Sequence, residues 1–104
     1  MRELSATATA ALLAEREMVL LDVREPWEYA HSHIEGSLHV PMQQVPDRLD
    51  EIPRELPLVV VCHHGMRSLQ VAHFLAAQGY ADVANLTGGI DAWSRTVDPT
   101  VPTY

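Results

Sequence analysis

The sequence contains no lysine and a single cysteine, Cys62, among its 104 residues. One cysteine cannot form an internal disulfide, which excludes a small secreted scaffold held together by disulfides. Seven arginines stand against fourteen acidic residues, so the formal net charge is -7. Nucleic acids and anionic membranes require a basic surface on their partners, and this acidic chain is therefore predicted to bind neither.

Long hydrophobic runs are also absent. No apolar stretch approaches the ~18 residues of a membrane-spanning helix, and the first residues lack the apolar segment of a secretory signal, so we expect a cytoplasmic protein. With 104 residues, 47% of them apolar, the chain has the size of one domain. We expect a core over about 4–95 and an extended tail over 96–104. Few apolar residues are expected at the surface, which favours a monomer.

Short apolar runs alternate with helical patterns along the chain. The runs that predict strands cover residues 2–4, 18–23, 37–40, 58–62 and 83–86. Apolar spacing, capping residues and prolines predict helices over 5–15, 26–30, 42–49, 67–78 and 90–95, with Pro46 breaking or restarting the third. This alternation predicts an α/β domain on a parallel sheet, with its functional site at the carboxyl ends of the strands.

The stretch from Leu58 to Gly79 is the most informative part of the chain. Its first five residues, L-V-V-V-C, predict a fully buried central strand. The helix that follows ends at Gly79, a residue typical of a left-handed cap. Cys62 therefore lies at the end of a strand, in a tight loop before a helix N-terminus. Loop amides and the helix dipole both favour thiolate over thiol, so we expect Cys62 to be the nucleophile.

The remaining candidate residues of the site follow the cysteine directly. They are His63, His64, Gly65, Met66, Arg67 and Ser68. Gly65 is expected to adopt a positive φ that turns the loop amides inward. Arg67 is expected to hold an anionic sulfonate group or to orient the loop carbonyls, and the alternative is a structural ion pair with a carboxylate such as Glu28. Ser68 is expected to cap the helix.

The histidines raise the question of a metal site. His31 and His33 are two residues apart, and His63 and His64 are adjacent. Neither spacing matches the i, i+4 pairs or the Cys and His patterns that bind zinc. We therefore expect no metal and no cofactor. His63 and His64 are better interpreted as residues that line the loop and donate hydrogen bonds to a bound anion.

Three motifs occur in order along the chain. Residues 20–41 read L-L-D-V-R-E-P-W-E-Y-A-H-S-H-I-E-G-S-L-H-V-P, residues 59–68 read V-V-V-C-H-H-G-M-R-S, and residues 86–93 read L-T-G-G-I-D-A-W. Together they resemble the amino-terminal signature, the active-site loop and the G-G-x-x-x-W segment of the rhodanese family of single-domain sulfurtransferases. Ser32 and Ser37 stand where this family usually has Gly and Ala.

The resemblance implies a fold, a reaction and two supporting residues. The fold is a five-stranded parallel sheet flanked by helices on both faces. The reaction moves a sulfane sulfur from thiosulfate or a persulfide donor to a thiophilic acceptor, cyanide or a thiol, through a persulfide on Cys62. Asp22 and Arg24, which follow the second strand, are implied to brace the loop, and the alternative is a solvated pair. A partner protein in a sulfur relay is a further possibility.

Two other functions are compatible with the same architecture. Cysteine-dependent phosphatases resemble C-x5-R, whereas four residues separate Cys62 from Arg67 here, and the shorter loop fits a sulfur atom better than a phosphate. Non-catalytic binding modules of this fold usually lose the nucleophile, which this chain keeps. Because the protein is acidic and has no lysine, we expect weak affinity for thiosulfate, which is a dianion.

Overall fold

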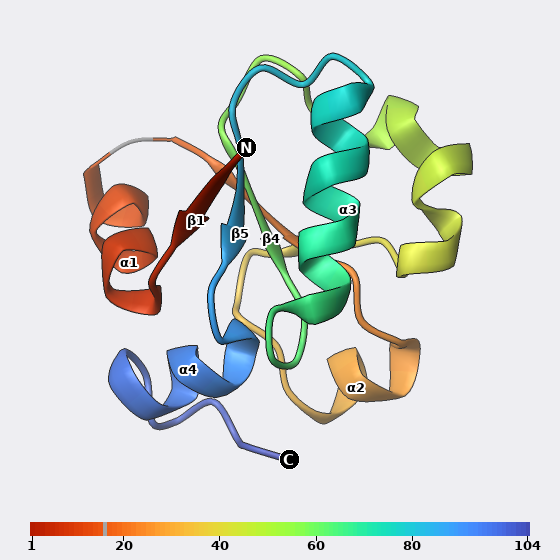
Figure 1. Cartoon of the computed structure of the whole chain (residues 1–104). Helices are drawn as coiled ribbons and strands as arrows, with labels where there is room; N and C mark the ends of the chain where they lie inside the picture. Colours follow the sequence, from red (N-terminus) through yellow and green to blue (C-terminus); the bar gives the residue numbers. More distant parts are fainter. Residues whose placement is uncertain (16) are drawn as a thin grey trace.

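Strands and helices alternate along the chain as predicted, and most bounds lie within two residues of the predicted ones (Figure 1). The computed structural model describes residues 1–15 and 17–104. Its elements are β1 (Arg2–Leu4), α1 (Ala6–Glu15), β2 (Val19–Asp22), α2 (Pro26–His31), β3 (Leu38–His39), η1 (Met42–Glu51), β4 (Leu58–Val61), α3 (Met66–Ala77), β5 (Val83–Leu86) and α4 (Gly89–Thr96). In the described residues, no helix has the length and apolar character needed to cross a membrane.

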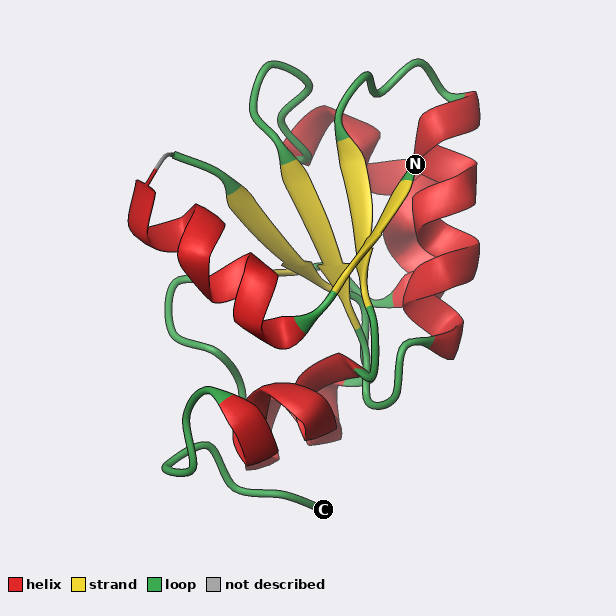
Figure 2. Cartoon of the chain, turned by 60° about the vertical axis from the view of Figure 1, so that its left-hand side comes forward, coloured by secondary structure: helices red, strands yellow, loops and turns green. Residues whose placement is uncertain are grey.

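The five strands form one sheet in the order β1-β5-β4-β2-β3, and all neighbouring pairs are parallel. Strand β4 lies in the middle, and its four residues are all buried, as the run of apolar residues predicts. Figure 2 shows helices on both faces of the sheet. Helices α3 and η1 cover one face, and α1 and α4 cover the other. The predicted architecture is confirmed.

Alternate residues of β4 face opposite layers of the core. Leu58 and Val60 pack in the layer beneath α3, and Val59 and Val61 pack in the layer with α4. Successive side chains of a strand point to opposite faces, so Cys62 continues the row of Leu58 and Val60. It accordingly belongs to the cluster beneath α3. The alternation of side chains along β4 thus places the Cys62 side chain on the face covered by α3, the helix that follows it.

Two connecting segments differ from the predictions. The segment η1 is a 3-10 helix that runs through Pro46, and its dihedral angles break instead at Arg48 (φ -122, ψ 25). A proline removes only one backbone hydrogen bond, and its fixed φ is suited to a helical turn. The 3-10 segment therefore tolerates Pro46. The tail is not uniformly extended, because residues 97–101 contain turns, and Val101 is buried in the core layer of α4. The chain ends between α4 and α2 (Figure 1).

Candidate active site

Cys62 lies directly after β4, at the carboxyl edge of the sheet, where the sequence predicts the site. It is 1% exposed, and its Sγ has two polar neighbours among the described residues. The backbone N–H of Gly65 donates to Sγ over 3.1 Å. The hydroxyl of Ser68 lies 3.3 Å from the same sulfur. Of these two neighbours, the Gly65 N–H is the hydrogen-bond donor to the sulfur, and a backbone N–H of this kind can also hydrogen-bond an anionic group carried on Cys62.

Gly65 closes the loop in the conformation that its sequence position predicts. Its φ is +97, and it precedes the first residue of α3. A Cβ at this position would lie 3.1 Å from the backbone nitrogen of Gly88 and 3.2 Å from the carbonyl oxygen of Leu86. Glycine is therefore required for two reasons, the left-handed backbone and the close approach of the β5–α4 turn.

The first turn of α4 supports the loop from outside. The N–H of Ile90 donates to the carbonyl of Cys62 over 2.8 Å, and the N–H of Asp91 donates to the carbonyl of His63 over 3.2 Å. A Cβ at Gly89 would overlap both carbonyl groups. The C=O and N–H of one peptide plane point in opposite directions, so the N–H groups of His63 and His64 point away from α4. This is the physical role of the Gly-Gly motif, which the sequence alone did not assign.

Ser68 does not cap α3, contrary to the prediction. The N-cap position belongs to Gly65, and no side chain caps the helix. Ser68 is fully buried and hydrogen-bonds instead to Asn85 and Cys62. The side-chain amide of Asn85 donates to Glu3 over 3.0 Å and to the Gly65 carbonyl over 3.1 Å, which leaves its oxygen for Ser68.

Asn85 is a site residue that the sequence reasoning missed. It is 2% exposed and lies in β5, in the otherwise apolar run V-A-N-L. A polar residue inside a fully buried strand is an informative signal, because burial without hydrogen bonds is costly.

Arg67 forms an ion pair with Glu28, the alternative that the sequence left open. Its two terminal nitrogens donate to the two carboxylate oxygens over 2.7 and 2.9 Å. The Glu28 side chain is 5% exposed, whereas the Arg67 side chain is 35% exposed. Burial alone would raise the pKa of Glu28, but hydrogen bonds from Arg67 and Tyr104 lower it to about 2. Three of the five N–H groups of a guanidinium remain for another acceptor when one carboxylate holds two.

Asp22 and Arg24 form a buried pair, so the solvated alternative is wrong. Arg24 is 0% exposed and Asp22 1% exposed. The guanidinium donates to both Asp22 oxygens and to the carbonyl of Ser32, which satisfies a charge that burial alone would make costly. Hydrogen bonds to Asp22 and Tyr104 outweigh the effect of burial and raise the pKa of Arg24. Bracing of the loop by this pair stays a prediction, since its hydrogen-bond partners among the described residues lie outside the loop.

Comparison with known proteins identifies the family. The rhodanese-like domain model matches residues 5–96. The chain belongs to the rhodanese-like family. A sulfurtransferase of Allochromatium vinosum is 42% identical over 100 residues, which cover 95% of this chain and 94% of the relative. The thiosulfate sulfurtransferase GlpE of Pseudomonas fluorescens is 40% identical over 87 residues, which cover 84% and 80% of the two chains.

A solved structure agrees with these relatives. The rhodanese-like domain protein of Staphylococcus aureus has a TM-score of 0.86 and 28% identity, covering 100% of this chain and 99% of that protein. The matches confirm the predicted α/β fold and the predicted class of enzyme, a sulfurtransferase of the rhodanese type. They do not test the roles of single residues, which stay predictions.

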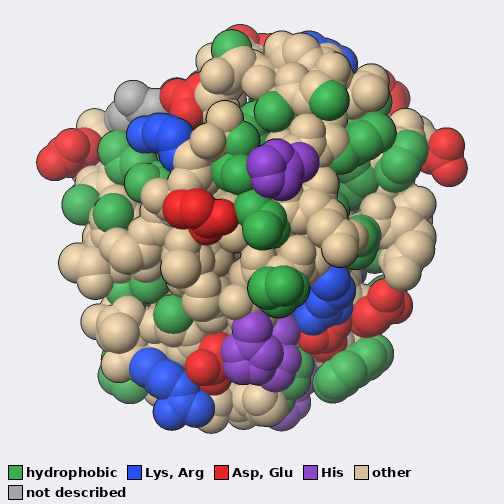
Figure 3. Space-filling view, viewed as in Figure 1, with side chains coloured by type: hydrophobic (Ala, Val, Ile, Leu, Met, Phe, Trp, Pro, Cys, Tyr) green, Lys and Arg blue, Asp and Glu red, His purple; other side chains and the backbone are tan. Residues whose placement is uncertain are grey.

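The loop histidines of this rhodanese-like domain stack on each other, with ring centroids 3.9 Å apart. Burial lowers the pKa of His63, and the neighbouring His64 lowers it further. Figure 3 shows histidine, arginine and acidic side chains gathered at the end of the molecule where α2 and α4 lie in Figure 1. Across residues 1–15 and 17–104, no group of three or more His, Cys, Asp or Glu could hold a metal ion.

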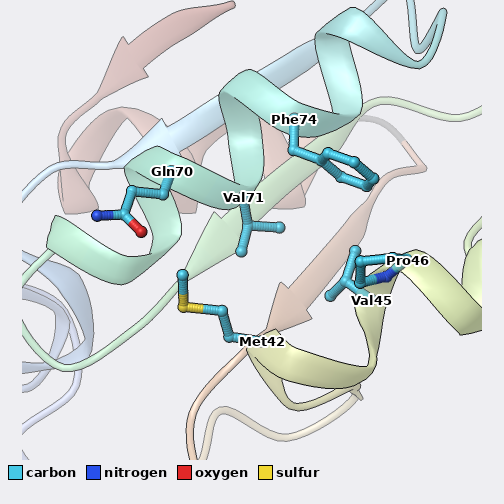
Figure 4. A pocket seen from close by; sticks show the side chains of 6 residues that line it. All are labelled: Met42, Val45, Pro46, Gln70, Val71 and Phe74. Carbon is cyan, nitrogen blue, oxygen red and sulfur yellow. The ribbon is translucent and has the colours of Figure 1, made fainter.

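An apolar hollow lies beside the site, between η1 and α3 (Figure 4). It has a volume of about 270 Å³ and is lined by Met42, Val45, Pro46, Gln70, Val71 and Phe74. None of these residues belongs to the loop 62–68. Charged groups do not line it, so the hollow is unsuited to a small anion. Met66, at the start of α3, is 72% exposed and forms part of the outer surface of that loop.

Proposed function

We propose that Cys62 carries a sulfane sulfur as a persulfide and transfers it from thiosulfate to a thiophilic acceptor, cyanide or a thiol. One observation carries this proposal: the sulfur of the single cysteine is held in a loop that donates the Gly65 N–H to it. The names of the curated relatives support thiosulfate as the donor.

The first half of the reaction loads the cysteine. The Cys62 thiolate attacks the outer sulfur of thiosulfate and forms a new S–S bond. The S–S bond of thiosulfate breaks, and sulfite leaves with the bonding electron pair. One thiolate and one dianion become one anionic persulfide and one sulfite dianion, so charge and electrons balance without an oxidant. The loop donors stabilise the negative sulfur in the same way that an oxyanion hole stabilises oxygen.

The second half unloads the persulfide. Cyanide attacks the outer sulfur of the persulfide, thiocyanate leaves, and the Cys62 thiolate is restored.

The Arg67 guanidinium is the one formal cation in the loop sequence 62–68. Its partly exposed side chain can hold the sulfonate oxygens of the donor while two of its N–H groups remain on Glu28. Three N–H groups of the fork are sufficient for this contact.

The overall charge favours a second donor besides thiosulfate. A net charge of -7 repels a dianion at long range, so we expect thiosulfate to saturate the enzyme well above low micromolar concentrations. A persulfide delivered by a partner protein would avoid this repulsion, because contact between the two proteins would bring the sulfur to Cys62 and no free dianion would have to approach. A sulfur-relay partner, the monomeric state and the cytoplasmic location are part of this proposal.

The test is a single-turnover measurement without an acceptor. Wild-type protein mixed with excess thiosulfate should release one sulfite for each Cys62, and addition of cyanide after the remaining thiosulfate has been removed should release one thiocyanate. Cys62→Ser should release neither. If wild type releases no sulfite with thiosulfate but yields thiocyanate after treatment with a small persulfide, the donor is wrong and the carrier role stands. If neither donor loads the protein, the proposal is wrong.

A further inference from the structure

The last residue of the sequence, Tyr104, returns to the loop from the tail after α4. Its ring stacks on His63, the residue after the cysteine, with centroids 3.9 Å apart and planes 7° from parallel. The His63 ring nitrogen Nε2 lies 3.0 Å from the Tyr104 carbonyl oxygen. Edge contacts with Trp27 and His31 place the same ring against α2. Tyr104 therefore lies between the loop and α2.

The Tyr104 hydroxyl joins the two ion pairs of the site. It donates to Glu28 Oε2 over 2.7 Å and accepts from Arg24 Nη1 over 3.0 Å. The single hydroxyl proton points to the carboxylate, because the guanidinium has no acceptor. Burial and the hydrogen bond to Glu28 raise the pKa of Tyr104 to about 12, so the hydroxyl keeps its proton at neutral pH. One hydrogen-bonded chain thus runs from Asp22 to Arg67.

The position of Glu28 depends on few groups. Its Oε1 accepts from the backbone N–H of Glu25 over 2.9 Å, and its Oε2 accepts from Tyr104. Among the described residues, the remaining hydrogen bonds to the carboxylate are the two from Arg67. Without the tyrosine hydroxyl, only the Glu25 amide of this set would hold the carboxylate against the pull of Arg67. The guanidinium of Arg67, whose side chain is partly exposed, could then move away from the loop toward solvent.

The tail itself is anchored independently of the loop. The N–H groups of Val97 and Asp98 donate to the Trp93 carbonyl, and the Val101 N–H donates to the Asp98 carbonyl. Val101 is 8% exposed and packs with the core layer of α4. These contacts fix residues 97–101, three residues before the tyrosine. The tail can therefore deliver Tyr104 to a defined place at the site.

We propose that Tyr104 is a positioning residue of the sulfur-transfer site, whose hydroxyl fixes Glu28 and through it the Arg67 guanidinium beside the Cys62 loop. This inference rests on the proposed function for its catalytic consequence. The polar neighbours of the Cys62 sulfur are Gly65 and Ser68, so the tyrosine acts at a distance from it. Its effect is electrostatic and passes through Arg67.

The test compares how fast two alkylating reagents modify Cys62. Iodoacetate and iodoacetamide are similar in size but differ by one negative charge, so the ratio of their rate constants reports the electrostatic potential at the sulfur. Tyr104→Phe keeps the ring that stacks on His63 and removes the hydroxyl. We expect this variant to lower the iodoacetate to iodoacetamide ratio by roughly 3- to 10-fold, because the nearby cation moves away. The kcat/KM for thiosulfate should fall by a similar factor.

Tyr80→Phe is the matched control. The Tyr80 hydroxyl also lies in the interior, on the η1 side of the core, and its single proton is shared between the carbonyl oxygens of Leu49 and Ile52, 3.1 and 2.8 Å away. Its loss should lower the melting temperature and leave the reagent ratio unchanged. A purely structural role of Tyr104 would give the same pattern as this control.

A double-mutant cycle with Arg67→Gln identifies the route of the effect. If Tyr104 acts through Arg67, Tyr104→Phe should change the ratio in the wild-type background and leave it unchanged in Arg67→Gln. An equal change in both backgrounds, or no change in either, would overturn the inference. The reagent ratio needs no sulfur transfer, so it tests the position of Arg67 even if wild type fails to load sulfur. Such a failure would count against the proposed function alone.

Discussion

The substitution Glu28→Gln removes the charge that holds Arg67 but keeps the shape of the side chain. The pKa of Glu28 is about 2, compared with 4.5 for an ordinary glutamate. At about 1.36 kcal/mol for each pKa unit, this difference corresponds to about 3 kcal/mol of folding free energy. The carboxylate is almost fully buried, so little of this value is lost to solvent screening. We expect Glu28→Gln to lower the free energy of unfolding by about 3 kcal/mol at pH 7.

The same substitution has a defined pH dependence. Because the pKa of Glu28 is lower in the folded state, its stabilisation is complete above the unfolded value of 4.5 and is lost as the pH falls toward 2. Urea unfolding of wild type and Glu28→Gln at pH 7 and pH 3 measures the difference directly. At about pH 3 the difference should be less than half of its value at pH 7.

Glu51→Gln is the control for this experiment. Glu51 also pairs with an arginine, Arg48, but both side chains lie at the surface. Surface pairs contribute little, so this variant should unfold almost as wild type does at both pH values. A Glu28→Gln difference that stays constant between pH 7 and pH 3, or that matches the Glu51 control, would refute the assignment of a buried, stabilising pair.

The other predictions concern the loop itself. Gly65→Ala should destabilise the protein by about 1–2 kcal/mol through its positive φ and should also slow sulfite release, because the new Cβ pushes on the β5–α4 turn. Gly36→Ala, with φ +84 and open space around it, should show a similar loss in melting temperature with unchanged turnover. Ser68→Ala should slow persulfide formation, measured as single-turnover sulfite release, and should leave Asn85 Oδ1 without its partner, at a cost of about 1–3 kcal/mol in urea unfolding. Equal turnover of Ser68→Ala and wild type would show that the hydroxyl does not assist the sulfur.

The fold could be predicted from local signals because they agree with one another. The run L-V-V-V has the composition of a buried parallel strand, and Gly65 and Gly79 stand where the backbone has positive φ. The order of strands in the sheet did not follow from these signals. The sheet order β1-β5-β4-β2-β3 depends on tertiary packing, whereas the parallel sheet followed from the alternation of strands and helices along the chain.

The site was predictable where its residues are neighbours in the sequence. Gly65 has the expected positive φ and donates to the sulfur of Cys62, whereas Ser68 does not cap the helix and pairs with the buried Asn85, 17 residues away. The pairing of Arg67 with Glu28 joins residues 39 positions apart, and composition could suggest it only as one alternative. Tyr104 is 80 positions from Arg24 in a tail that reads as extended, so its place in the site required the three-dimensional structure.

The most direct test of the central claim is the intact mass of the protein after incubation with excess thiosulfate under non-reducing conditions. Wild type should gain the mass of one sulfur atom, cyanide should remove it, and Cys62→Ser should gain nothing. If wild type gains no sulfur from thiosulfate or from a small persulfide while Cys62 still reacts with iodoacetamide, the account of Cys62 as a sulfur carrier is contradicted.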